Sequence, residues 1–420
     1  MDISIIVIGD EILLGQVTDT NSGDIARTFS TANWQINRVF TVGDNADEIK
    51  AAVHAAMNLS DIVITTGGLG PTKDDITKNV LLDIFGGELI FDNEVLKNVE
   101  DVCNRRHIKI NELTRNQAFV PSSAKIIQNV VGTAPIMWFE QTVGGKEKVL
   151  VTLPGVPAET SHMIKTTVFP QLLSHFGCDI SVSHRNLLVY GITESGIAEM
   201  LDTWEDNLPP YLHLAYLPVP GYQKLRLDGI HADADFINNL LDEKVAELKA
   251  ILGDAVFAEK DAPVAEIALE MLRKHGYTFA TAESCTGGNI AHSITLIPGS
   301  SDVFLGSVVS YANSVKTNIL GVDANTIETL GAVSVPVAEQ MAFGVIKSLG
   351  SDCSVATSGI AGPGGGTPEK PVGTVCIAVH TPLKTLSGTY FFPGNRQRII
   401  ERATAAALIE LIRILEPVKY

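Results

Sequence analysis

Ser284 and Cys285 lie side by side in the stretch with the clearest capacity for chemistry, Thr281-Ala-Glu-Ser-Cys-Thr-Gly-Gly-Asn-Ile290. A short apolar run at residues 277–280 precedes it and a helical pattern follows, which predicts a turn from a strand into a helix. Free N–H groups at a helix start, with glycines that allow close approach, can hold an anion or an oxyanion. A nucleophile at such a turn is typical of acyl transfer. An ordinary helix cap uses the same residue types, so both interpretations stay open here.

Further loops in the C-terminal third could supply a base and hydrogen-bond donors. Tyr311 and Lys316 follow an expected strand at residues 303–310. A lysine whose pKa is lowered by burial can take the proton of a serine. A glycine-rich loop at residues 357–366 follows another expected strand and could donate N–H groups to an oxyanion or a phosphate. No histidine accompanies these motifs, and His275 and His292 fall on expected helices, so no Ser-His-Asp triad is predicted.

Two loops near the N-terminus combine glycines with oxygen-bearing side chains. Residues 9–21 and 65–75 each follow an expected parallel strand, and open α/β sheets bind ligands at that edge. Paired carboxylates beside glycines suggest a divalent cation bridging a diphosphate, although Asp74 and Asp75 could simply cap the next helix. A proline-stiffened turn at residues 153–159 is expected to line the same cleft. The expected metal ligands are Asp10, Glu11, Asp74 and Asp75, and the expected phosphate contacts are Gly9, Asn21, Gly67, Gly68, Gly70, Thr72, Pro157 and Glu159.

Length and composition limit the class of protein. A chain of 420 residues is expected to form two or three domains, and it has no apolar run approaching the ~20 residues of a membrane span. The apolar start favours a buried strand over a signal peptide. Five cysteines without CxxC spacing argue against a disulfide framework or a zinc site and favour the cytoplasm. The net charge of −17 disfavours nucleic-acid binding but allows small phosphorylated ligands.

Apolar periodicity divides the chain into three parts. Residues 1–177 alternate strand and helix patterns, which predicts a parallel sheet covered by helices. Residues 178–257 form a small, acidic α+β module, and residues 258–420 alternate helix and strand again. The expected strands are 4–8, 34–41, 61–65, 148–153, 185–190, 213–217, 224–230, 303–310 and 353–356. The expected helices are 23–31, 47–58, 75–85, 158–173, 194–204, 233–252, 264–275 and 395–415.

The two N-terminal loops and the turn Leu153-Pro-Gly-Val-Pro-Ala-Glu159 resemble the molybdopterin-binding fold family. With the C-terminal motifs, the chain resembles the competence/damage-inducible CinA family over nearly its whole length. That resemblance implies a metal-dependent ADP-ribose pyrophosphatase in the first domain, giving AMP and ribose 5-phosphate, and a homodimer. It also implies a KH-like middle module. This module contains no GxxG loop, so no RNA partner is expected.

The third part resembles the nicotinamide mononucleotide (NMN) deamidase family known as PncC, through TAESCTGG, YANSVK, GAVS and SGIAGPGGGTPEKPVGTV. The resemblance implies hydrolysis of NMN to nicotinate mononucleotide and ammonia, without a cofactor. Ser284 would attack the amide, Lys316 would take its proton, and Tyr311 would position or relay it. Cys285 is the rival nucleophile. The remaining expected substrate contacts are Glu283, Thr286, Gly287, Gly288, Asn313, Thr357, Ser358, Gly359 and Arg396.

The expected fold is therefore a molybdopterin-binding-like α/β domain, a KH-like α+β module and a second α/β domain of the PncC type. The alternative function is a nucleotide-binding regulatory protein of the competence or DNA-damage response, with at most one active site. Membrane partners are not expected.

Overall fold

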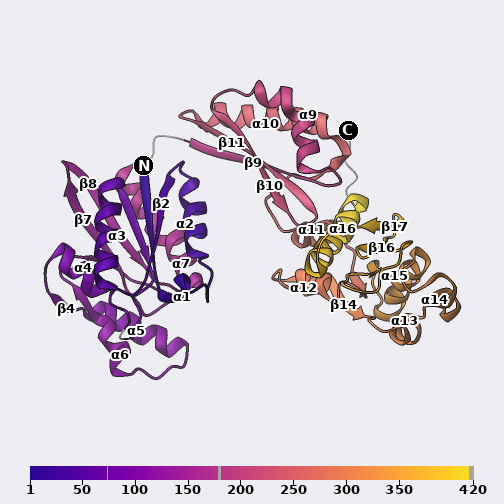
Figure 1. Ribbon diagram of the computed structural model, residues 1–420, viewed down its shortest axis with the longest axis horizontal. Coiled ribbons are helices and arrows are strands. Elements are labelled where there is room, and N and C mark those ends of the chain that lie inside the picture. Colours follow the sequence, from indigo (N-terminus) through magenta and orange to yellow (C-terminus); the bar gives the residue numbers. More distant parts are fainter. Residues whose placement is uncertain (73, 178–180, 416–420) are drawn as a thin grey trace. The chain divides into compact units, whose positions relative to one another are not determined.

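The computed structural model describes residues 1–72, 74–177 and 181–415, which form two compact units (Figure 1). The first unit comprises Met1–Val182 together with Ile230–Ala234, and the second holds the rest of the described chain. The expected domain junction at residues 177 and 178 adjoins residues 178–180, which lie outside the described residues. No helix in the described ranges is long and apolar enough to cross a membrane.

The first unit is built on a six-stranded sheet in the order β2-β1-β3-β8-β7-β6. The first four strands run parallel, β7 runs antiparallel to β8, and β6 runs antiparallel to β7. The strands are β1 (Asp2–Ile8), β2 (Gln35–Val42), β3 (Ile62–Thr66), β6 (Lys125–Ile127), β7 (Ile136–Val143) and β8 (Lys146–Leu153). Because both faces are covered, the central strand β3 is buried at every residue and shows no alternation of buried and exposed positions.

Helices cover both faces of this sheet. One core contains the buried residues of α2 and α7, and the other contains those of α3 and α4. The helices are α1 (Asp10–Leu13), α2 (Asn21–Ser30), α3 (Ala46–Leu59), α4 (Thr77–Phe85), α5 (Asn93–Arg105), α6 (Glu112–Arg115), α7 (Pro157–Met163) and α8 (Phe169–Phe176). A small antiparallel ribbon is formed by β4 (Leu89–Phe91) and β5 (Phe119–Pro121). In the sequence, β4 precedes α5 and β5 follows α6.

The helix expected at residues 158–173 is divided in the structure. A π-helical segment, Ile164–Val168, separates α7 from α8. Pro170 lies in the first turn of α8, where its missing N–H removes one bond to the preceding turn. The sequence therefore predicted the helical stretch but not its interruption.

The second unit begins with the KH-like module, a four-stranded sheet in the order β10-β11-β9-β12. Its core packs α9 and α10 against that sheet. The elements are β9 (Ser181–Val189), α9 (Glu194–Asp206), β10 (Leu212–Val219), β11 (Tyr222–His231), α10 (Ala234–Leu252) and β12 (Val256–Ala258).

The C-terminal domain has a five-stranded sheet in the order β14-β13-β15-β16-β17. The strands β14 (Phe304–Val309), β13 (Phe279–Glu283) and β15 (Cys353–Gly359) are parallel, whereas β16 (Thr374–His380) and β17 (Thr385–Phe391) are antiparallel. Alternate residues of β13 face α11 and α16 on one side and α15 on the other. The helices are α11 (Val264–His275), α12 (Asn289–Thr295), α13 (Asn313–Leu320), α14 (Ala324–Leu330), α15 (Val335–Leu349) and α16 (Arg396–Leu415).

The predicted fold class is confirmed: two α/β domains with parallel strands flank a small α+β module. The helix predicted at residues 264–275 has the bounds of α11. Residues 86–145 had no predicted elements, and the structure places the β4–β5 ribbon, two helices and two sheet strands there.

Candidate active sites

Ser284 directly follows β13, the second strand of the C-terminal sheet. Hydrogen bonds continue past the strand on both sides, since Ser284 N donates to Thr357 O at 2.9 Å and Ser310 N donates to Glu283 O at 2.8 Å. The backbone at Ser284 is therefore held between the ends of β14 and β15. The three parallel strands end at the same edge of the sheet, where the predicted site loops gather.

Lys316, on α13, points its amine at this serine. Its Nζ lies 3.1 Å from Ser284 Oγ and donates to Ser310 O at 2.6 Å. The side chain is 1% exposed, and no carboxylate in the described part of the chain lies within ion-pair distance. Burial without a counter-ion lowers the pKa of Lys316. A lysine amine of lowered pKa, held beside a hydroxyl by a backbone carbonyl, has the arrangement of a general base and its nucleophile.

Cys285 lies in the same turn, but its environment favours the unreactive, protonated form of its thiol. Its side chain is 6% exposed, and burial raises the pKa of the thiol to about 12. The thiol therefore stays protonated near neutral pH and is a poor nucleophile. The structure supports Ser284 over Cys285 as the attacking group.

A cavity of about 310 Å³ opens in front of the Ser284–Lys316 pair. Arg396, at the start of α16, donates to Tyr311 Oη at 2.8 Å and to Gly362 O at 2.7 Å. Tyr311 is 63% exposed, and its hydroxyl is committed to Arg396 rather than to the serine or the lysine. The residues lining the cavity are Ser284, Cys285, Tyr311, Asn313, Lys316, Ala332, Val333, Ser358, Gly359, Ile360, Ala361, Gly362, Gly364, Gly365 and Arg396.

The expected substrate contact Glu283 has a different place. Its carboxylate is fully buried and accepts hydrogen bonds from the N–H groups of Gly288, Ile290 and Ala291 at 2.9–3.1 Å. The protein's own carboxylate thus occupies the helix N-terminus that was expected to hold a substrate oxyanion or phosphate. Glu283 and Gly288 are structural in this arrangement.

Three other expected contacts also lie off the cavity wall. Thr286 and Thr357 are buried and bond to each other through their hydroxyls at 2.7 Å. Gly287 has φ of +63°, which this turn requires, but it does not line the cavity. Cys285 directly follows the nucleophile and lines the cavity, so its backbone N–H adjoins Ser284. An amide at this position is the usual oxyanion donor beside a nucleophilic serine.

Replacing Glu283 by glutamine is expected to destabilise the C-terminal domain by about 2–3 kcal/mol, because an amide cannot accept all three N–H bonds and its own NH₂ would face donors. The measurement is thermal unfolding of Glu283→Gln beside a control at an exposed position of the same domain, Glu328→Gln. A large rise in KM with unchanged stability would instead mean that Glu283 contacts substrate.

The first unit carries a second cavity, of about 410 Å³, at the carboxyl edge of β1, β3 and β8. Gly67 allows the loops to close around it, since a Cβ there would lie 2.0 Å from Ile8 O. Asn21 joins two more loops by donating to Thr66 Oγ1 at 2.8 Å and to Gly155 O at 2.9 Å. Its Oδ1 is buried and has no partner among the described residues, so it is available to a ligand. Of the expected phosphate contacts, the lining includes Gly9, Asn21, Gly67, Gly68, Gly70, Thr72 and Pro157.

Carboxylates dominate this cavity. Its described lining contains Glu11, Asp19, Asp44, Asp74 and Asp75 and no Lys, Arg or His side chain. A diphosphate would be repelled here unless cations neutralised it. Within the described ranges, however, no three His, Cys, Asp or Glu side chains converge to enclose a metal ion by themselves. The oxygen donors fit a hard divalent cation in chemistry, with phosphate oxygens and water completing the shell.

Two of the expected metal ligands have local hydrogen-bond roles. Asp75 accepts from Gly70 N at 2.6 Å and Thr72 N at 2.8 Å, which closes the glycine loop. Asp10 does not line the cavity, because its carboxylate accepts from Asp44 N while Asp44 accepts from Asp10 N. Burial raises the pKa of Asp44, and neighbouring carboxylates add to the rise. Asp44 is the acidic residue that the sequence reasoning missed, although it follows an expected strand as Asp10 does.

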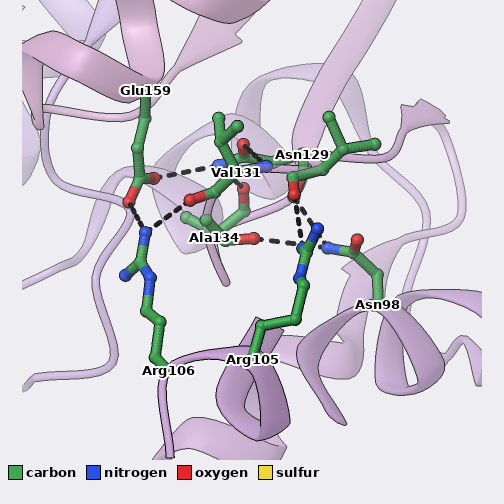
Figure 2. A network of polar contacts seen from close by, with 9 residues as sticks. Asn98, Arg105, Arg106, Asn129, Val131, Ala134 and Glu159 are labelled. Atoms are coloured by element: carbon green, nitrogen blue, oxygen red, sulfur yellow. Dashed lines mark hydrogen bonds and ion pairs between the residues drawn. The ribbon is translucent and has the colours of Figure 1, made fainter. Parts of the chain in front are cut away.

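Glu159 is the expected phosphate contact that the structure removes from the cavity. Figure 2 shows its carboxylate directed at Arg106 and Asn129, at 3.3 Å and 3.0 Å. Arg105 donates to Val130 O at 2.6 Å in the same network. The network joins α5, the 129–134 loop and α7. Glu159 therefore holds the helix that begins at Pro157 rather than touching a ligand.

Known protein families match three consecutive parts of the chain. A model described as "Probable molybdopterin binding domain" matches residues 4–174. The "Damage-inducible protein CinA KH domain" matches residues 184–258, and the "CinA C-terminal domain" matches residues 261–415.

Relatives extend the similarity over the whole length. The CinA-like protein of Flavobacterium psychrophilum is 39% identical, covering 97% of this chain and 97% of that protein. The CinA-like protein of Gemmatimonas aurantiaca is 41% identical, covering 98% and 96%. Among solved structures, the competence/damage inducible protein CihA from Agrobacterium tumefaciens is 39% identical over 36% of this chain and 96% of that one, with a TM-score of 0.35.

Proposed function

The chain belongs to the family of CinA-like proteins, and from that premise we propose that its C-terminal domain is a serine-dependent amidohydrolase that converts NMN to nicotinate mononucleotide and ammonia. One observation carries the proposal: a buried lysine, with no counter-ion among the described residues, lies 3.1 Å from the hydroxyl of Ser284. Perturbed titratable groups in a cavity are concentrated at functional sites.

The reaction has two halves. Ser284 Oγ attacks the carboxamide carbon while neutral Lys316 takes the hydroxyl proton, and the Cys285 N–H stabilises the oxyanion. Lys316 then returns that proton to the leaving nitrogen, and ammonia departs from an acyl-enzyme. Water attacks the ester with Lys316 again accepting a proton. The carboxylate product leaves and the serine hydroxyl is restored.

The residues that line the cavity suit a ligand with an aromatic ring and a phosphate group at a distance from that ring. Ala332, Val333, Ile360 and Ala361 supply apolar surface for the nicotinamide ring. No carboxylate is among the described lining residues, and Arg396 supplies a guanidinium at the cavity. Arginine suits phosphate because its fork of donors matches phosphate oxygens.

The experiment is a measurement of ammonia release from NMN and from its dephosphorylated form, nicotinamide riboside, by the purified full-length chain. We expect turnover of NMN, with kcat/KM at least about tenfold lower for the riboside. Tight binding of NMN without ammonia release would favour the alternative of a nucleotide-binding regulatory protein.

The N-terminal domain is proposed to be a metal-dependent pyrophosphatase that cleaves ADP-ribose to AMP and ribose 5-phosphate. The supporting observation is the cavity lined by five carboxylates and by no basic side chain among its described residues. Glu11, Asp44, Asp74 and Asp75 are the residues that would hold a divalent cation, which supplies charge neutralisation at the diphosphate. The glycines of the 67–70 loop bring its backbone to the cavity wall, and Asn21 Oδ1 can accept a hydrogen bond from the substrate.

Removing divalent metal with a chelator is expected to lower ADP-ribose hydrolysis at least about 100-fold, because unneutralised carboxylates repel the diphosphate. NMN deamidation by the same protein is the internal control and is expected to change less than about twofold, since Ser–Lys chemistry needs no metal. Added Mg²⁺ or Mn²⁺ should restore the first activity. Survival of both activities in chelator would contradict the metal assignment.

The homodimer stays a prediction, checked by the molar mass of the protein in solution.

A further inference from the structure

A third cavity, of about 310 Å³, adjoins the carboxylate cavity of the first unit. The two share Gly70, Thr72 and Asp75, so the glycine loop that Asp75 closes is a common rim. None of the expected functions used this second space. Its described lining is Gly70, Pro71, Thr72, Asp75, Lys78, Asn79, Leu89, Leu113, Asn116, Gln117 and Phe119.

The chemistry of this compartment contrasts with that of its neighbour. Leu89, Leu113 and Phe119 give it an apolar wall, and each of these side chains is more than a third exposed. Asn79 and Asn116 add amide donors and acceptors. The apolar side chains and the amides together are the usual recognition groups for a nucleobase, which stacks on its face and hydrogen-bonds at its edge.

Lys78 adds a cation to the lining of the third cavity. Among the described residues lining either cavity, it is the single basic side chain. Its Nζ donates to Phe119 O at 2.6 Å, which holds the amine beside the apolar wall and leaves two of its three donors for a ligand. A phosphate attached to a nucleoside in this compartment would meet that amine.

We propose that this compartment holds the nucleoside monophosphate end of the N-terminal domain's substrate, with the base against Phe119 and the adjoining phosphate beside Lys78. The scissile diphosphate would then cross the shared rim into the carboxylate cavity. The identity of the substrate rests on the proposed pyrophosphatase function, whereas the compartment's preference for a nucleoside monophosphate does not. The arrangement selects a substrate with an aromatic base over inorganic pyrophosphate or a sugar phosphate.

The test is calorimetric titration of AMP into the full-length chain with chelator present. Phe119→Ala is expected to weaken AMP binding about tenfold, the usual effect of losing one base–aromatic stack. Lys78→Met is expected to weaken AMP about tenfold while changing the affinity for adenosine less than about twofold, because only the phosphate is affected.

Phe91→Ala is the matched control. Phe91 and Phe119 form one edge-to-face pair with ring centroids 5.2 Å apart and are 39% and 38% exposed, yet Phe91 does not line the cavity. Both variants lose the same aromatic contact. They differ in that only Phe119 lines the cavity, so a difference in AMP affinity reports on that lining. Thermal unfolding checks that the two variants lose stability equally. The control is expected to bind AMP within about twofold of the wild type.

The outcomes distinguish failure of the nucleoside monophosphate compartment from failure of the proposed pyrophosphatase function. AMP binding with the expected variant pattern, but no cleavage of ADP-ribose, would support the compartment and reject the pyrophosphatase. Cleavage of ADP-ribose with an unchanged KM in Phe119→Ala and Lys78→Met would overturn the compartment. Failure of the wild type to bind AMP, or equal losses in Phe119→Ala and Phe91→Ala, would also overturn it.

Discussion

Ser284→Ala is expected to lower the kcat of NMN deamidation about 10⁴-fold, because water must then attack an amide that the serine would otherwise acylate. The substitution removes one oxygen, and Lys316 keeps its bond to Ser310 O. The melting temperature should therefore stay close to that of the wild type. The measurement is the rate of ammonia release from saturating NMN, with thermal unfolding to show that the fold is retained.

The adjacent residue provides the matched control. Cys285→Ala removes the rival nucleophile from the same turn, and its thiol is held protonated by burial. We expect this variant to retain activity within about tenfold, the loss coming from altered packing beside the serine. Full activity in Ser284→Ala together with loss in Cys285→Ala would reverse the assignment of the nucleophile.

Lys316→Met is expected to lower deamidation about 10³-fold or more and, at neutral pH, to raise stability by about 1–2 kcal/mol. Methionine fills a similar volume without a charge to desolvate. The substitution leaves the Ser310 carbonyl without its donor, which offsets part of the gain. A residue that lowers stability and yet is needed for activity is performing chemistry rather than holding the fold.

The pH dependence follows from the direction of the pKa shift. Burial lowers the folded-state pKa of Lys316 below its unfolded value. The folded protein therefore loses stability as pH falls from the unfolded pKa to the folded pKa, and keeps a constant penalty below the folded pKa. The rate of deamidation should decrease as pH falls through the folded-state pKa of Lys316, because the protonated amine cannot accept a proton.

Urea unfolding of the wild type and Lys316→Met across pH is the corresponding measurement. The stability advantage of the variant should shrink as pH rises through the unfolded pKa of lysine. An advantage that is the same at every pH, or a variant that is less stable throughout, would contradict a lowered pKa for Lys316 in the folded protein.

The loops that form both sites could be predicted from the sequence, because each of these loops follows a parallel strand of its sheet. In such sheets, every loop that leaves a strand's carboxyl end is a candidate. That rule leads to the turn after β13 and to the two N-terminal glycine loops, and the family resemblance that it supported is confirmed. The pairing of Ser284 with Lys316 was expected, and the structure places their side-chain atoms within hydrogen-bond distance.

The direction of each side chain could not be predicted in the same way. Glu283 and Ser284 are neighbours in sequence but point to opposite sides of the turn, one into the helix start and the other into the cavity. Glu159 turns to Arg106, 53 positions away, and no local pattern indicates that partner. Asp10 and Asp44 cap one another across two loops, so only the fold shows which of them faces the ligand.

The central claim is that Ser284 carries the acyl group during amide hydrolysis. The most direct measurement is mass spectrometry of peptides from the full-length chain, quenched in acid during turnover of NMN. We expect an adduct with the mass of NMN less ammonia on Ser284, formed in the wild type and in Cys285→Ala. An adduct on Cys285, or continued turnover by Ser284→Ala, would contradict it.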